Sequence, residues 1–217
     1  MRANVVVIIA DIVNSKRIIQ RDEFQRSLKM VLSRVSKRSR KHLLSPFTLT
    51  LGDEFQAVYS RFDSLFADIL EIAFEIYPEP VRYAVAYGPL STDINPIAAL
   101  EMDGRAFHDA RDLLVDNLKK ERRTIIQIST TELFNPSLVD ISLRLFCNEL
   151  QTWNRNTFSV FLSLIGGVSV EVAASRASVS RRAAYKTIAT HHLRDYLDLL
   201  RTLTNELTHG LNFDMGE

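Results

Sequence analysis

The order of apolar and polar residues in the first half of the chain predicts strands joined by amphipathic helices. Residues 5–9 are an unbroken run of valine and isoleucine that leads to Asp11, as in a central strand buried on both faces. In residues 47–51 apolar side chains alternate with threonines, and residues 55–59 are rich in strand formers. These two stretches predict a hairpin that turns at Gly52-Asp53.

Three amphipathic segments and two further apolar runs complete this half. We predict helices over roughly 21–42, 64–77 and 104–120, strands over 81–88 and 124–128, and helical connections over 130–151. Counting the hairpin as two strands, the order is β-α-β-β-α-β-α-β. This order predicts an α+β fold, a ferredoxin-like palm with one added unit.

The tail after residue 151 reads as purely helical. One predicted helix closes at Gly166-Gly167, and Ser169 and Ser180 are each placed to cap a following helix. Val172 and Ala173 are expected to face inward, with a turn at 177–179. The spacing of the two capped helices and of the turn between them is typical of a helix-turn-helix. A last helix over 193–207 is either core or a dimer face.

The tail also carries a local positive charge. Residues 151–194 hold six basic residues against Glu171 alone, a net charge of +5. Because early residues of a recognition helix enter the major groove, Arg181, Arg182 and Lys186 are the predicted contacts to double-stranded DNA. The alternative is a helical hairpin that packs on the first domain with its arginines in solvent.

Composition narrows the class of protein. The 217 residues and 46% hydrophobic content fit a palm domain over residues 1–150 and a small domain over 151–217. The net charge of +1 draws the whole molecule to neither nucleic acid nor membrane. Cys147 is the single cysteine, which excludes an intrachain disulfide. No apolar run approaches the roughly 20 residues of a membrane span. We therefore expect a cytoplasmic protein without a membrane partner.

Two acidic residues are the candidate ligands of a metal ion. Asp11 ends the first strand and Asp53 stands in the hairpin turn. Two carboxylates on fixed backbone suit Mg²⁺ or Mn²⁺, since hard cations prefer oxygen ligands completed by substrate phosphates. The loop that holds Asn14, Ser15 and Lys16 can bind phosphate at a helix N-terminus. The alternative is a capping Asp11, an ordinary turn residue Asp53 and an ordinary capped loop.

Two stretches resemble known families. Residues 5–15 resemble the first metal motif of class III nucleotidyl cyclases. Leu51-Gly52-Asp53-Glu54-Phe55 resembles their second metal motif and the GGDEF signature of diguanylate cyclases. Residues 81–88 resemble the cyclase strand that follows. With residues 102–111 and the helical tail, nearly the full chain resembles the SatD family.

The cyclase resemblance implies roles for particular residues. Asp11 and Asp53 would be the metal ligands, assisted by the Ile12 carbonyl, and the amides of Asn14 and Ser15 would lie near the phosphates. Leu49 stands where the cyclases have a base-selecting lysine. His108 and Asp112 occupy the positions of their asparagine and arginine, with Arg111 one residue away.

His108 and Arg111 are therefore the candidate catalytic residues, provided that they point into a shared site. The alternative is a surface pair on an amphipathic helix.

Three functions follow. The first is a homodimeric, nucleotide-responsive DNA-binding regulator that takes a nucleoside triphosphate with Mg²⁺ or Mn²⁺. The second is an active two-metal nucleotidyl cyclase or nucleotidyltransferase. The third is a degenerate palm that only assembles partners. The missing lysine favours the first over the second, and the presence of both aspartates disfavours the third.

Overall fold

The computed structural model describes residues 4–50, 52–129 and 135–213. Leu51 in the predicted hairpin and residues 130–134 in the predicted helical connections lie outside the described residues. The strands are β1 (Asn4–Ile12), β2 (Leu43–Leu49), β3 (Glu54–Tyr59), β4 (Val81–Pro89) and β5 (Ile125–Ile128). The helices are α1 (Arg21–Arg38), α2 (Leu65–Glu75), α3 (Arg105–Asp112), α4 (Pro136–Leu150), α5 (Arg155–Ile165), α6 (Val170–Arg176), α7 (Arg181–Thr190) and α8 (Leu193–Phe213).

The predicted α+β class and the order of elements up to β5 are confirmed, with shifts at several boundaries. The first helix ends at Arg38 rather than near 42, because β2 already begins at Leu43. The helix predicted over 104–120 is α3 continued by a π-helical segment, η2 (Leu113–Leu118). A short 3₁₀ turn, η1 (Ser15–Arg17), follows β1.

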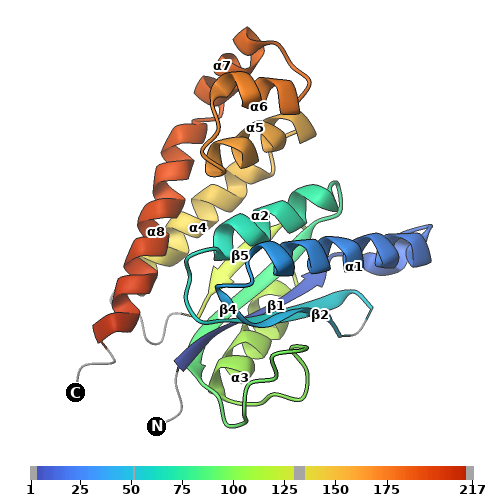
Figure 1. Cartoon of the computed structure of the whole chain (residues 1–217), viewed down its shortest axis with the longest axis vertical. Helices are drawn as coiled ribbons and strands as arrows, with labels where there is room; N and C mark the ends of the chain where they lie inside the picture. The colour runs from blue at the N-terminus through green and yellow to red at the C-terminus, as the bar shows by residue number, and fades with distance from the viewer. Residues whose placement is uncertain (1–3, 51, 130–134, 214–217) are drawn as a thin grey trace.

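The strands form one sheet in the order β2-β3-β1-β4-β5. The central strand β1 pairs antiparallel with β3 and β4, and β5 adds parallel to β4. Residues 5–10 of β1 are all buried, as the unbroken valine and isoleucine run predicts. Figure 1 shows α1 and α2 covering one face of the sheet and α3 covering the other.

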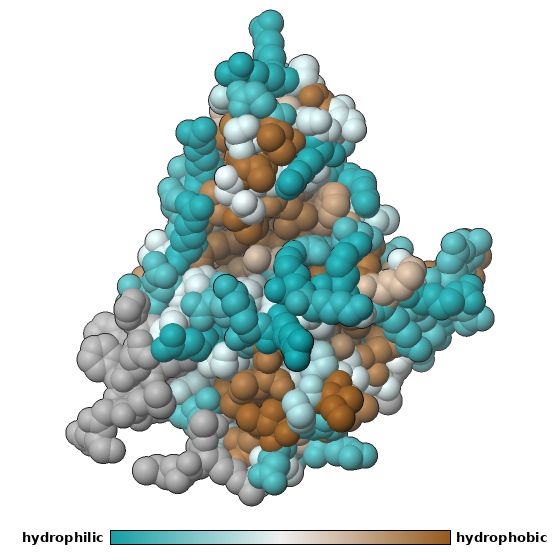
Figure 2. Space-filling model, viewed as in Figure 1, coloured by the Kyte–Doolittle hydropathy of each residue, from teal (hydrophilic) through white to brown (hydrophobic). Residues whose placement is uncertain are grey.

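The helices after β5 share the apolar core of the sheet half. The Phe74 ring of α2 meets the Phe158 ring of α5 at 5.6 Å, and the Arg155 guanidinium lies 4.6 Å from the Phe74 centroid. A cleft of about 570 Å³ lies beside this contact, between α2 and α5. Figure 2 shows apolar surface in the hollow between α2 and the helices above it. The last helix was expected to be either core or a dimer face. Its leucines lie in the core: Leu193, Leu200, Leu203 and Leu207 of α8 are buried.

Helices α6 and α7 begin where the sequence predicts. The Ser169 and Ser180 hydroxyls accept hydrogen bonds from the amides of Val172 and Ala183. The expectation that Val172 faces inward is wrong: its side chain is 43% exposed, because the buried face of α6 is formed by Val170, Ala173 and Ala174. Within the described part of the chain, no helix has the length and hydropathy needed to cross a membrane.

Candidate functional site

Charged residues gather at the end of β1. In the sheet register, Asp11 lies opposite Glu54 of β3 on one side and Arg82 of β4 on the other. Residues paired across adjacent strands project from the same face, so these three side chains are neighbours. The Ile12 amide donates to the Asp53 carbonyl at 3.1 Å. The structure thus brings the hairpin tip with Asp53 to the end of the strand that carries Asp11.

The hairpin tip is fixed from two sides. The Thr50 amide donates to the Glu54 carbonyl at 2.8 Å and closes the turn, in which Gly52 has φ of 82°. The Gln25 side chain of α1 donates to the Gly52 carbonyl at 2.8 Å. The Ser15 hydroxyl of η1 donates to Oδ2 of Asp53. The Asp53 carboxylate is therefore held by both the turn geometry and the loop after β1.

Arg82 is the residue that the sequence reading missed. Its side chain is almost fully buried and donates from Nη2 to Oδ2 of Asp11 and from Nη1 to the Lys119 carbonyl at 2.6 Å. Its buried Nε has no hydrogen-bond partner among the described residues. An arginine inside an otherwise apolar strand was the available signal, because a buried charge requires a partner.

Glu54 and Arg111 form the second pair. Arg111 of α3 reaches Glu54 with both terminal nitrogens, Nη2 donating to Oε1 at 2.8 Å and Nη1 to Oε2. The Thr50 hydroxyl also donates to Oε1, at 3.1 Å. Glu54 was not singled out from the sequence, although it adjoins Asp53. The hydrogen bond with Glu54 raises the pKa of Arg111, and the charge of Asp11 adds to the rise.

The acids at the end of β1 repel one another. Burial raises the pKa of the Asp11 carboxyl, Arg82 opposes this, and the charges of Asp53 and Glu54 add to the rise. A cation beside Asp11 and Asp53 would relieve this repulsion.

The donor set fits a partly hydrated divalent ion. Among the described residues, hydrogen bonds engage Oδ2 of Asp11 and Oδ2 of Asp53, which leaves Oδ1 of each for a ligand. Glu54 is committed to Arg111, and the described residues hold no group of three acidic, histidine or cysteine side chains placed to bind a metal. Two carboxylates completed by water and phosphate oxygens is a common arrangement for Mg²⁺.

The predicted phosphate-binding and catalytic residues differ in how close they lie to Asp11 and Asp53. Ser15 is buried against Asp53, whereas Asn14 has φ of 56° and accepts a hydrogen bond from Arg122 at 3.0 Å. Lys16 is exposed. His108 contacts Asp103 at 2.6 Å, with both side chains more than 60% exposed, and this hydrogen bond lowers the pKa of Asp103. The structure thus brings Arg111, and not His108, to the acidic cluster.

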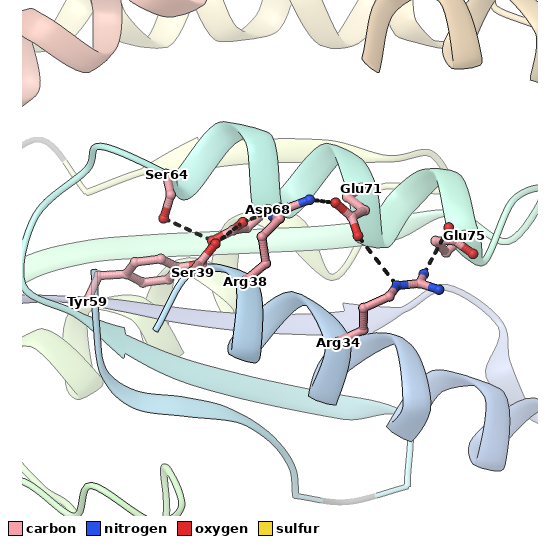
Figure 3. A network of polar contacts seen from close by, with 8 residues as sticks. All are labelled: Arg34, Arg38, Ser39, Tyr59, Ser64, Asp68, Glu71 and Glu75. Carbon is pink, nitrogen blue, oxygen red and sulfur yellow. Dashed lines mark hydrogen bonds and ion pairs between the residues drawn. The ribbon is translucent and has the colours of Figure 1, made fainter. Parts of the chain in front are cut away.

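A second polar cluster has a structural role. Asp68 of α2 is fully buried and accepts hydrogen bonds from Arg38 and Ser39 at the end of α1. Tyr59 of β3 and Ser64 also donate to it, at 2.9 and 3.0 Å. Figure 3 shows these groups converging on one carboxylate, with Arg34, Glu71 and Glu75 extending the network along the surface. A buried charge with this many donors fixes α1 and α2 against the sheet.

The basic residues predicted on α7 differ in their surroundings. Arg181 pairs with Glu171 of α6 at 2.9 Å and lies 5.6 Å from the centroid of the Tyr185 ring. Arg182 and Lys186 are exposed, and neither forms an ion pair with a described residue. The turn between α6 and α7 has Ser178 in the left-handed region, with φ of 54°.

Comparison with known proteins gives one family and two structures. The model of the SatD family matches residues 5–182. Two solved structures, each described as a bacterial light-regulated adenylyl cyclase, match at 15% identity with TM-scores of 0.40 and 0.38. In both cases the match covers 51% of this chain and 39% of the other, so the chain spans about two fifths of their length. No curated protein matches the sequence.

Proposed function

The chain belongs to the SatD family, and we propose that it is a nucleotide-responsive regulator with two binding surfaces. The first takes a nucleoside triphosphate with Mg²⁺ or Mn²⁺ at the end of β1. The second binds duplex DNA through a helix-turn-helix formed by α6 and α7. The observation that carries the proposal is the approach of Asp11 to Asp53, two mutually repelling carboxylates that each keep one oxygen for a ligand.

The residues of the first surface have separate roles. When bound, the divalent ion would neutralise the two aspartates and hold phosphate oxygens. Ser15 orients Asp53, and Arg82 orients Asp11. Arg111 lies close enough to raise the local positive potential and is 40% exposed, so it is available to a phosphate if it leaves Glu54.

DNA binding rests on the exposed start of α7. Ser180 caps this helix, so its first residues are fixed, and Arg182 and Lys186 lie one turn apart in solvent without an acidic partner among the described side chains. Arg181 is already paired with Glu171 of α6, so its proposed role is to position α7 against α6. Coupling between the two surfaces would pass through the contact of α2 with α5, where Phe74 meets Phe158 and Arg155.

Nucleotide binding is tested by titrating fluorescent ATP and GTP analogues with and without Mn²⁺. We expect cation-dependent binding that Asp53→Asn weakens at least about tenfold, since a ligand charge is lost. Asp63→Asn is the matched control, because Asp63 is exposed beyond the opposite end of β3. Pyrophosphate release abolished by Asp53→Asn would instead establish the nucleotidyl cyclase alternative. Absence of both binding and turnover would leave only the assembly role.

DNA binding is tested by the salt dependence of affinity for duplex DNA. Replacing Arg182 and Lys186 with alanine should lower the slope of log K against log salt by about 1 per cation removed. The matched control replaces Lys29 and Lys37, which are exposed cations of α1, with alanine. An equal loss of DNA affinity in both double variants would show that only overall charge matters. Unchanged affinity in the variant that lacks Arg182 and Lys186 would contradict the proposal.

A further inference from the structure

A groove of about 540 Å³ lies between helix α1 and the edge strand β2. This volume is typical of sites for small molecules. Its lining includes neither Asp11 nor Asp53, so the groove is separate from the proposed cation site. Most of the lining is apolar and comes from one residue of α1 and five of β2: Leu32, Leu43, Leu44, Pro46, Phe47 and Leu49.

The helix side of the groove is cationic. Lys29 and Lys37 of α1, and Arg40 just after it, line the groove with the serines at positions 33 and 36. Helix positions three and four residues apart are neighbours, so the lining residues of α1 share one face. Among the described lining residues there is no acidic side chain. None of the three cations forms an ion pair with another described residue.

The cations on the other side of α1 have acidic partners. Arg34 pairs with Glu75 at 2.9 Å, and Arg38 pairs with Asp68 and Glu71. Figure 3 shows both arginines reaching the acidic side chains of α2. The cations of the groove lie on the same helix or next to it, yet the described residues supply no counter-charge for them. An anionic ligand would supply it.

The backbone of β2 disfavours a peptide strand as the occupant. A strand that adds to a sheet pairs with free N–H and C=O groups of the edge. The Phe47 amide already donates to the Ser36 hydroxyl at 3.0 Å, and Pro46 has no N–H to offer. Recognition in the groove is therefore left to apolar side chains and cations, a combination that suits an anion with an apolar body.

We propose that the groove between α1 and β2 binds a small amphiphilic carboxylate, an acyl or aromatic body that ends in an acidic head group. The apolar body would lie on Leu32, Phe47 and Leu49. The head group would pair with Lys37 and Arg40, because a guanidinium can donate two parallel hydrogen bonds to a carboxylate. This site goes beyond the proposed function, and its occupancy requires neither nucleotide nor DNA.

Calorimetric titration of the full chain with octanoate tests the proposal. We expect octanoate to bind, and octanol, the same chain without the charge, to bind at least about tenfold more weakly. Lys37→Gln/Arg40→Gln should weaken octanoate binding at least about tenfold. The matched control is Arg26→Gln/Lys41→Gln, which removes two exposed cations that do not line the groove. An equal loss in both double variants, equal binding of octanol, or no binding of octanoate would overturn the proposal.

Two further measurements test the place of the apolar body and the source of the anion. Ser33 is exposed and lines the groove, so Ser33→Trp should fill the groove and abolish octanoate binding with an unchanged melting temperature. Ser27→Trp is the control, because Ser27 is exposed on α1 outside the groove. Octanoate binding retained in Ser33→Trp would contradict the proposal. Binding to vesicles of anionic phospholipid without affinity for octanoate would assign the cations to a membrane surface and overturn it.

Discussion

The buried guanidinium of Arg82 on β4 is bound to the Asp11 carboxylate on β1, its neighbour across the strand pair. The Lys119 carbonyl holds the other terminal nitrogen of the same arginine. One oxygen of Asp11 is thus occupied by the protein, and the carboxylate is aimed before any ligand arrives. This pairing makes Arg82 a positioning residue for the proposed cation site.

Arg82→Met should destabilise the fold by about 3 kcal/mol, because it leaves the Asp11 carboxylate partly buried without its partner. Asp11→Asn in the same chain should recover much of that loss, since no uncompensated charge then remains. Urea unfolding of the two single variants and the double variant measures both effects. Additive losses would show that the two side chains do not act as a pair.

Gly52→Ala should destabilise the protein by about 1 kcal/mol and weaken cation-dependent nucleotide binding. Gly52 has φ of 82°, and an added Cβ would lie 2.9 Å from Nε2 of Gln25. Gln25 would therefore move away, and its hydrogen bond to the Gly52 carbonyl would no longer hold the tip that carries Asp53. Gly167→Ala is the control, because Gly167 has φ of 71° but nothing within 4 Å of an added Cβ. It should cost similar stability without changing nucleotide affinity.

Asp68→Asn should cost about 3 kcal/mol, because four donors would lose a buried charged acceptor. Tyr59→Phe removes one of those hydrogen bonds and should cost about 1 kcal/mol. Thermal or urea unfolding gives both values. Glu75→Gln, at the partly exposed end of the same network, should change stability by less than about 0.5 kcal/mol.

Cys147 should be inert in the folded protein. Burial raises the pKa of its thiol to about 12, and only the thiolate reacts with disulfide or alkylating reagents. We expect no labelling by a thiol-reactive disulfide at pH 8 in buffer and complete labelling in denaturant. Rapid labelling of the native chain would show that α4 opens from β5.

The hydrogen bonds of Glu149 should make the stability of the fold depend on pH. Its pKa is lowered: partial burial raises it, but hydrogen bonds from His191, Trp153 and Thr152 outweigh that effect. An acid with a lowered folded pKa stabilises the fold above its ordinary pKa and loses this contribution as pH falls through the lowered value. Glu149→Gln should therefore reduce stability at neutral pH and flatten the acid limb, as measured by melting temperature against pH.

The sequence alone was sufficient for most secondary-structure elements. The run over residues 5–9 predicted the central strand, the residues around Gly52 predicted the hairpin turn, and Ser169 and Ser180 predicted two helix starts. Each of these depends on residues close together in the chain, where backbone preference and hydrophobic spacing act directly. Val172 was misplaced because a short helix of small residues gives a weak periodic signal.

Only the tertiary structure decided which charges meet. Arg82 with Asp11, and Arg111 with Glu54, are separated by 71 and 57 positions, and their pairing depends on strand order and on where α3 lies. The same holds for the exposed side of α4, where Leu138, Ile141 and Leu145 lie at the surface of the described residues, since burial of a helix face depends on the elements packed around it. Local spacing determines which elements form, whereas long-range packing determines which side chains those elements bring into contact.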